Sequence, residues 1–313
     1  MDDSREHHDL QIVDKEYGAP YSKGLMAQSL MATGLEPERS YHIAREIEQH
    51  LIASGESSIS LARLQNIAQQ VLGEEEGQTF TERYRRWRLL GELDKPIIIL
   101  IGGATGVGKS TLATQIAHRL GITRLTASDL IRQVMRAFFS ADLMPAIHYS
   151  SFEAGQMVKA AEVKGADRDI TGFVEQVEKV CVGVNAIIER AITEGTPMIV
   201  EGAHLVPGFL KEDLWKDALV IQMVLIVEDV ERHQGHFYVR DQETGGVRSL
   251  EKYVKNLDKI RRVQDYLVQA ARKSKVPVID NQNIDDAVKT VMGIVLETVD
   301  KYQKSSNLEI EVN

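Results

Sequence analysis

The segment that begins at Gly103 and ends at Ser110 has the spacing G-x-x-x-x-G-K-[ST]. It directly follows the apolar run Ile97–Ile101, and a helical pattern begins at Lys109. Glycines let the backbone wrap closely around phosphates, and the start of the helix adds partial positive charge. Because Lys109 can reach the β- and γ-phosphates and Ser110 can bind Mg²⁺, the motif predicts ATP or GTP binding with Mg²⁺. The predicted nucleotide-binding residues are Gly103, Ala104, Thr105, Gly106, Val107, Gly108, Lys109, Ser110 and Thr111.

Two carboxylates follow other predicted strands. Glu201 ends the apolar run that begins at Met198, and such an acid holds the Mg²⁺ shell or orients the attacking group in phosphate-loop proteins. Asp129 follows a short strand and starts a helix, so it can act on an acceptor, or it can share a plain helix-capping role with Ser128. We treat Ser110, Glu201 and Asp129 as candidate metal ligands. The sequence leaves open which carboxylate acts on the acceptor.

Several cations are candidates for the acceptor site. Arg132 and Arg136 are one helical turn apart and could clamp an anion, although a solvated helix face is the alternative. Arg240 precedes Gly245-Gly246 in a segment that resembles a lid, and we expect it to neutralise charge on the transferring phosphoryl group. Arg261 and His204 complete the predicted substrate site, and a structural histidine is the alternative for His204. His233 and His236 are spaced for a shared metal, but no third ligand accompanies them, so we do not predict a zinc site.

The elements needed to position these residues alternate along the second part of the chain. Apolar runs at 97–101, 123–126, 198–200, 219–227 and 276–279 alternate with helical patterns at 109–120, 130–139, 172–194 and 250–274. This alternation predicts an α/β fold with a parallel sheet that has helices on both faces. Residues 12–90 read instead as a small, mostly helical module, with helices beginning at Ser22, Ser40, Ser60 and Phe80. We therefore place domains at 1–92 and 93–313, with a last helix from 284 to 302 and a disordered tail after it.

Composition limits the other classes of function. The net charge is −9 in 313 residues, which disfavours non-specific nucleic-acid binding. No apolar run approaches the length of a membrane span, and the first residues do not resemble a secretory signal. The single cysteine, Cys181, excludes an intrachain disulfide. We expect a cytoplasmic protein that binds neither nucleic acid nor membranes.

Beyond the phosphate loop, several motifs resemble those of archaeal 2-phosphoglycerate kinases. They are Ser128-Asp129-Leu130-Ile131-Arg132, the run Glu201-Gly202-Ala203-His204-Leu205-Val206-Pro207-Gly208, and His236-Phe237-x-x-Arg240. The resemblance covers most of residues 95–300, and the run from Glu201 to Gly208 is its most specific part. It implies a P-loop kinase that converts ATP and 2-phosphoglycerate into ADP and 2,3-bisphosphoglycerate, the precursor of cyclic 2,3-bisphosphoglycerate in methanogenic archaea.

The N-terminal part resembles an ATP-cone domain, with Tyr21-Ser22-Lys23-Gly24 near its start. The resemblance implies an accessory module that binds a second nucleotide and regulates the attached enzyme. The chain could also form a homo-oligomer. Within the implied reaction, Lys109, Glu201, Asp129 and Arg240 are the expected catalytic residues.

Two other functions fit the same residues. The cationic pocket could serve another phosphorylated polyol, such as an inositol phosphate, because spacing alone does not rank acceptors. A regulatory NTP-binding switch would also need the phosphate loop, but it would not need Asp129, the paired arginines or the lid. A small-molecule kinase is therefore the primary interpretation.

Overall fold

The computed structural model describes residues 11–13, 19–20, 22–32, 34–54, 58–60, 66, 69–73, 75–77, 79–80, 90, 93–159, 165, 167–243 and 250–312. The chain divides into two compact units. The N-terminal unit comprises Met1–Leu93, Arg119–Gly121 and Met292–Asn313, and the sheet unit comprises Asp94–His118 and Ile122–Val291. The domain assignments 1–92 and 93–313 stay predictions.

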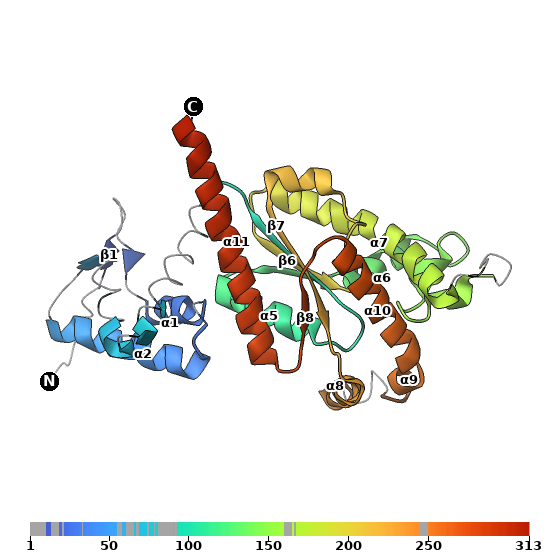
Figure 1. Cartoon of the computed structure of the whole chain (residues 1–313), viewed down its shortest axis with the longest axis horizontal. Helices are drawn as coiled ribbons and strands as arrows, with labels where there is room; N and C mark the ends of the chain where they lie inside the picture. Colours follow the sequence, from blue (N-terminus) through green and yellow to red (C-terminus); the bar gives the residue numbers. More distant parts are fainter. Residues whose placement is uncertain are drawn as a thin grey trace, which may run out of the picture. The chain divides into compact units, whose positions relative to one another are not determined.

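The sheet unit is built on five parallel strands (Figure 1). They are β4 (Ile97–Gly102), β5 (Arg124–Ala127), β6 (Met198–Gly202), β7 (Leu219–Ile226) and β8 (Val278–Asp280). The spatial order is β5-β6-β4-β7-β8, so β4, the first of these five strands along the chain, lies in the centre. Every residue of β4 and β6 is buried, as a strand covered on both faces requires. The predicted parallel α/β sheet is confirmed.

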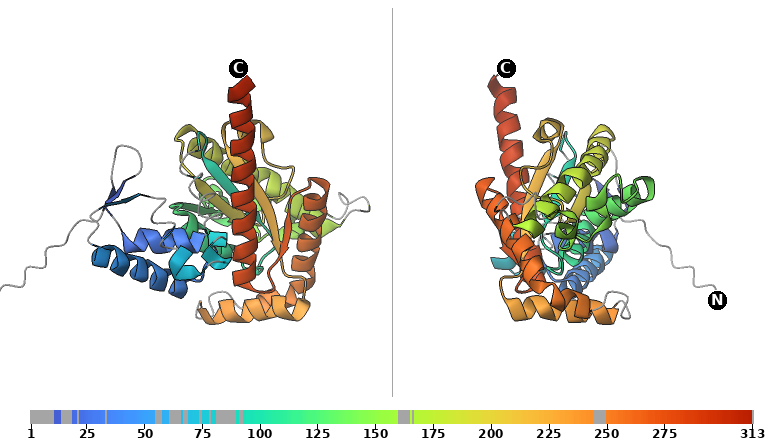
Figure 2. Two further views of the ribbon diagram at one scale, coloured as in Figure 1. Left: turned by 60° about the vertical axis from the view of Figure 1, so that its left-hand side comes forward. Right: turned by 90° about the vertical axis from the view of Figure 1, so that its right-hand side faces the viewer.

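Helices lie on both faces of this sheet (Figure 2). The helices of this unit are α5 (Lys109–Leu120), α6 (Ser128–Phe138), α7 (Arg168–Thr193), α8 (Val230–Glu243), α9 (Leu250–Lys255), α10 (Leu257–Lys273) and the first residues of α11 (Ile284–Val312). Short 3₁₀ segments η2 (Pro145–His148), η3 (Ala154–Met157) and η5 (Glu212–Asp217) complete the unit.

Two predictions for the C-terminal region are wrong. The pattern 250–274 forms two helices, because the helix breaks at Asn256. There the side-chain amide donates to the Lys252 carbonyl oxygen at 2.9 Å, and the backbone N–H donates to the Tyr253 carbonyl oxygen, three residues back. The segment after residue 302, predicted to be a disordered tail, continues α11 to Val312. Within this segment, Lys304 pairs with Asp300 one helical turn earlier, at 2.7 Å.

The described N-terminal unit is mainly helical, with α1 (Lys23–Ala32) and α2 (Pro37–Ser54). A three-stranded sheet accompanies them: β1 (Gln11–Val13) pairs antiparallel to β2 (Ala19–Pro20) and parallel to β3 (Ser58–Ser60). Its core contains Met26, Leu30, Ile43, Ile47, Leu51, Leu72 and Phe80. Ser60, predicted to begin a helix, instead pairs with Val13 as the end of a strand. Most of the predicted helix after Phe80 lies outside the described residues.

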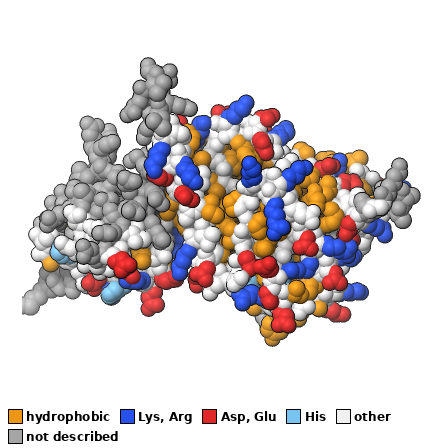
Figure 3. All heavy atoms as spheres, viewed as in Figure 1, with side chains coloured by type: hydrophobic (Ala, Val, Ile, Leu, Met, Phe, Trp, Pro, Cys, Tyr) orange, Lys and Arg blue, Asp and Glu red, His pale blue; other side chains and the backbone are white. Residues whose placement is uncertain are grey.

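Surface charge on the sheet unit is mixed. On the face drawn in Figure 3, the coloured Lys and Arg side chains alternate with Asp and Glu side chains. A contiguous basic surface, which non-specific nucleic-acid binding requires, does not form among the described residues on that face. Within the described part of the chain, no helix combines the length and the apolar character needed to span a membrane.

Candidate active site

The candidate site lies at the carboxyl ends of the central strands. Strands β6 and β7 flank β4, and the chain leaves β4 into the phosphate loop. Glu201 on β6 is in register with Ile101 of β4 and with Ala127 of β5. Open α/β sheets bind ligands at such an edge, where the strand order reverses. The sheet therefore brings the phosphate loop, Glu201 and the start of α6 to one place.

The phosphate loop has the backbone that its glycines predict. The first helical hydrogen bond of α5 runs from Leu112 N–H to Gly108 carbonyl oxygen at 3.0 Å, so residues 109–111 present N–H groups without helical partners. Gly106 has φ 87°, and a Cβ there would lie 2.2 Å from the ring of Phe237. The position thus requires glycine both for its conformation and for the close approach of α8.

Lys109 is a buried cation beneath this loop. Its Nζ donates to the Ala104 carbonyl oxygen at 2.7 Å. Burial lowers the pKa of Lys109, while the nearby charges of Glu201 and Asp129 act in the opposite direction. A buried ammonium group beside a row of unpartnered helical N–H groups suits a bound anion such as phosphate.

Ser110 and Glu201 meet across the sheet edge. The Ser110 hydroxyl donates to Glu201 Oε1 at 2.7 Å, and the Glu201 side chain is buried. Hydroxyl and carboxylate oxygens are hard ligands, which suit Mg²⁺ beside nucleotide phosphates. These two residues therefore fit the metal that the motif predicts.

Asp129 and Arg132 form a pair on the first turns of α6. Arg132 Nε donates to Asp129 Oδ1 at 2.8 Å, and the Asp129 side chain is 64% exposed. The capping alternative is wrong, because Ala127 is the N-cap residue and no side chain caps this helix. Asp129 thus stands at the sheet edge with an exposed carboxylate that accepts a hydrogen bond from Arg132.

The two α6 arginines differ in their surroundings. Arg132 is buried, and its Nη1 donates to the carbonyl oxygens of Ile147 at 2.7 Å and Tyr149 at 2.8 Å. Arg136 is exposed and donates to Gln133 at 3.1 Å. Arg132 therefore ties α6 to the η2 segment, whereas Arg136 has the exposure that binding an anion needs.

A buried polar chain supports the start of α6. Ser128 Oγ lies 2.8 Å from His204 Nδ1, and His204 Nε2 lies 3.0 Å from Gln176 Oε1. The Gln176 amide nitrogen donates to the carbonyl oxygens of Ala146 and Tyr149, so its oxygen is the acceptor for His204 Nε2–H. Nδ1 is then the acceptor for the Ser128 hydroxyl. Both nitrogens of His204 serve protein partners, which supports the structural alternative for this residue.

Arg261 contacts the segment that connects β7 to α8. Its guanidinium group donates to the carbonyl oxygens of Val227 at 2.6 Å and Glu228 at 2.9 Å. The backbone of Arg240 lies in α8, but its side chain is outside the described residues. The predicted lid tip, Gly245-Gly246, is outside them as well.

The sequence did not indicate the contacts that four residues make around the site, and two of them, Gln176 and Asn281, were not singled out at all. Gln176 holds His204, and His233, His236 and Asn281 donate to carbonyl oxygens of the phosphate loop. The histidines stood out by their spacing, which permits a shared metal, although a zinc site was not predicted. The structure directs each ring to a different loop carbonyl. Nothing in the local sequence around Gln176 or Asn281 indicates a role.

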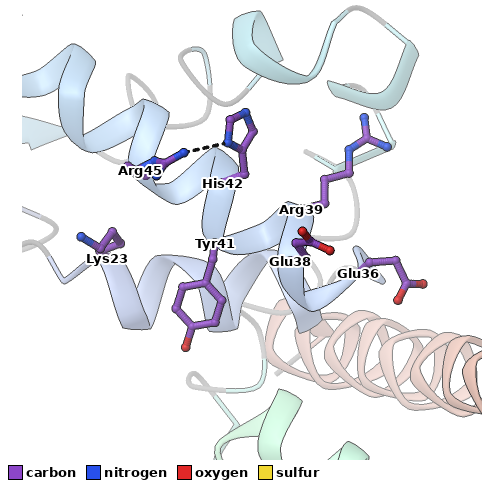
Figure 4. A pocket seen from close by; sticks show the side chains of 7 residues that line it. All are labelled: Lys23, Glu36, Glu38, Arg39, Tyr41, His42 and Arg45. Atoms are coloured by element: carbon purple, nitrogen blue, oxygen red, sulfur yellow. Dashed lines mark hydrogen bonds between the residues drawn. The ribbon is translucent and has the colours of Figure 1, made fainter.

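A pocket of about 840 Å³ lies in the N-terminal unit (Figure 4). It is lined by Lys23, Glu36, Glu38, Arg39, Tyr41, His42 and Arg45. Lys23 pairs with Glu48 at 3.1 Å, and Arg39 pairs with Glu76. In Figure 4, Tyr41 points away from His42 and Arg45, so these side chains do not converge on one ligand. A second nucleotide at this unit stays a prediction.

No family model matches the chain. Curated proteins that resemble it over most of its length are 2-phosphoglycerate kinases. The chain is 39% identical over 289 residues to a 2-phosphoglycerate kinase of Methanopyrus kandleri, covering 92% of this chain and 88% of the relative. It is 38% identical to the 2-phosphoglycerate kinase of Methanothermobacter thermautotrophicus, covering 93% and 95%. Among solved structures, shikimate kinase from Acinetobacter baumannii is 16% identical with a TM-score of 0.39, covering 67% of this chain and 97% of that one. A likeness at that level does not bear on function.

Gly202→Ala should destabilise the sheet unit. Gly202 has φ 152°, and a Cβ there would lie 1.8 Å from Ser128 Oγ, so we expect a loss of about 2–3 kcal/mol in the free energy of unfolding. Gly235→Ala on α8 is the matched control, because its Cβ meets no atom within 4 Å. It should leave stability equal or raise it by up to about 1 kcal/mol. Equal urea midpoints for the two variants would contradict this account.

His204 should make stability depend on pH. Burial lowers the pKa of His204 to about 3, below the usual 6.5. Between about pH 3 and pH 6.5, the unfolded chain therefore binds a proton on His204 that the folded chain does not bind. The contribution of His204 to the free energy of unfolding is then complete above about pH 6.5. It is lost as the pH falls, by about 1.4 kcal/mol per pH unit. From pH 7 to pH 5, the wild type should lose about 2 kcal/mol more than His204→Asn in urea unfolding. The same loss in both proteins would show that His204 titrates normally.

Proposed function

The chain belongs to the 2-phosphoglycerate kinase family, and on this premise we propose that it transfers the γ-phosphoryl group of ATP to the 3-hydroxyl of 2-phosphoglycerate. The products are ADP and 2,3-bisphosphoglycerate. The observation that supports transfer most directly is the meeting of Lys109, Ser110 and Glu201 beside an exposed Asp129 at one edge of the sheet.

The donor half of the site binds the nucleotide phosphates. The N–H groups of residues 109–111 and the Lys109 ammonium group neutralise charge on the β- and γ-phosphates as it moves during transfer. Ser110 and Glu201 would hold Mg²⁺, which supplies further charge neutralisation when bound. Catalysis on this side is therefore mainly positioning and electrostatic stabilisation.

The acceptor half needs a proton acceptor and cations. We assign Asp129 the proton of the 3-hydroxyl: the hydroxyl oxygen forms the new P–O bond, the bond between the γ-phosphorus and the bridging oxygen of ADP breaks, and the proton passes to Asp129. Arg132 holds Asp129 in place through its 2.8 Å contact. Arg136 and Arg240 are the cations assigned to the phosphate and carboxylate of the acceptor.

Two alternatives keep the same donor site. Another phosphorylated polyol would use the same cations, and a nucleotide-dependent switch would transfer nothing. An exposed carboxylate held by a buried arginine favours transfer, because a switch has no use for a proton acceptor there. A homo-oligomeric state, a cytoplasmic location and a regulatory nucleotide at the N-terminal unit stay predictions.

Product analysis tests the reaction directly. We would measure ADP release from Mg-ATP with and without 2-phosphoglycerate and identify the product by ³¹P NMR. Strong stimulation, together with the two phosphate resonances of 2,3-bisphosphoglycerate, is the expected result. Slow ATP hydrolysis that 2-phosphoglycerate does not change would remove this acceptor, and other phosphorylated polyols would then be compared in the same assay.

Lys109→Ala should abolish transfer while the protein remains folded. The variant lacks the buried ammonium group, so we expect kcat/KM to fall by at least about 10²-fold. Lys211→Ala, at an exposed lysine outside the site, is the control and should keep wild-type turnover. Far-UV circular dichroism checks the fold of both variants. Near-normal turnover in Lys109→Ala would overturn the proposed mechanism.

A further inference from the structure

Four consecutive carbonyl groups of the phosphate loop each accept a hydrogen bond from a side chain. The Ala104 carbonyl oxygen accepts a hydrogen bond from Lys109 Nζ at 2.7 Å, and both residues belong to the motif. The other three donors come from distant segments. The Thr105 carbonyl oxygen accepts from His233 Nε2 at 2.8 Å. The Gly106 carbonyl oxygen accepts from His236 Nδ1 at 2.9 Å, and that of Val107 accepts from Asn281 Nδ2 at 3.0 Å.

These bonds determine where the loop N–H groups point. A trans peptide unit is planar, so its carbonyl oxygen and the following N–H point in opposite directions. Because the carbonyls of residues 105–107 face outward to side chains, the N–H groups of residues 106–108 face the inner side of the loop. That inner side is where a bound phosphate accepts them.

The His233 ring is held rigidly in this position. It is fully buried and stacks on Phe237 with centroids 5.1 Å apart, and Phe237 stacks on Tyr253 at 5.0 Å. Burial lowers the pKa of His233 to about 4, so the ring is neutral at pH 7 and carries a single proton. Its Nδ1 is buried and has no hydrogen-bond partner. The ring therefore leaves one polar atom unsatisfied while Nε2 donates to Thr105.

We propose that His233, His236 and Asn281 are positioning residues for phosphoryl transfer, holding the phosphate loop with its N–H groups toward the nucleotide phosphates. Their assigned action runs through the loop carbonyl groups that they contact. This inference rests on the proposed kinase function. It also explains why two histidines three residues apart occur on α8 without a third metal ligand: each ring serves its own carbonyl.

A crossed amide substitution tests the proposal, because the two histidines donate from different ring nitrogens. Asn can present Nδ2 near the place of His Nδ1, and Gln can present Nε2 near the place of His Nε2. His236→Asn should therefore keep the bond to Gly106, and His236→Gln should lose it. His233→Gln should keep the bond to Thr105, and His233→Asn should lose it.

The expected result is opposite preferences at the two positions. At each one, kcat with the matching amide should exceed kcat with the mismatched amide by about 10-fold or more, because a loop misplaced by about 1 Å can cost up to 10²-fold. KM for 2-phosphoglycerate should change little. Equal kcat for the two amides at both positions, whether high or low, would overturn the proposal, since a purely structural role does not distinguish them.

Two further measurements keep the outcome decisive. The dissociation constant of a non-hydrolysable ATP analogue, measured by calorimetry, should follow the same crossed preference and does not need an acceptor. It would therefore still test the positioning role if the full-length protein failed to phosphorylate 2-phosphoglycerate. Unfolding midpoints report folding, and if the variants of buried His233 do not fold, the pair at the partly buried His236 decides alone.

Discussion

A phosphate loop can direct its N–H groups inward only if its carbonyl oxygens have donors on the outer side. A carbonyl group shielded from water without a partner costs about 1–3 kcal/mol, so the outward carbonyl groups of residues 105–107 need donors. Two histidines of α8 and Asn281, directly after β8, supply them, while Lys109 bonds to the Ala104 carbonyl oxygen from within the motif. This requirement connects the nucleotide site to elements far along the chain.

The sheet order makes these connections possible. Because β4 lies in the centre, the loop after it lies beside the ends of both β6 and β7. Glu201 at the end of β6 reaches Ser110 on one side, and α8, which follows β7, brings its histidines from the other. Phe237 fills the space that Gly106 leaves open. One parallel sheet thus provides the metal-binding carboxylate and the loop supports at the same edge.

The acceptor half depends on a different buried network. Gln176, His204 and Ser128 link α7, the loop after β6 and α6, while Arg132 links α6 to the η2 segment. Each of these groups is satisfied by protein partners, which gives them well-defined positions. Asp129, the exposed carboxylate beside them, is therefore held on a rigid support. This arrangement suits a residue that must meet a small hydroxyl group with accurate geometry.

Local patterns in the sequence determined the parallel strands, the phosphate loop and Glu201 as the acid of the adjacent strand, because strand hydrophobicity and loop spacing act over few residues. Only the tertiary structure decided the roles of Arg132, His204, His233, His236 and Asn281. His233 and Asn281 meet the loop across 128 and 174 residues of sequence, and no periodicity records such a contact. The spacing of Arg132 and Arg136 predicted a shared anion clamp, with a solvated helix face as the alternative, and neither pattern indicates that Arg132 is buried. Its burial depends on the carbonyl oxygens of Ile147 and Tyr149, which reach it only when the chain folds back over α6.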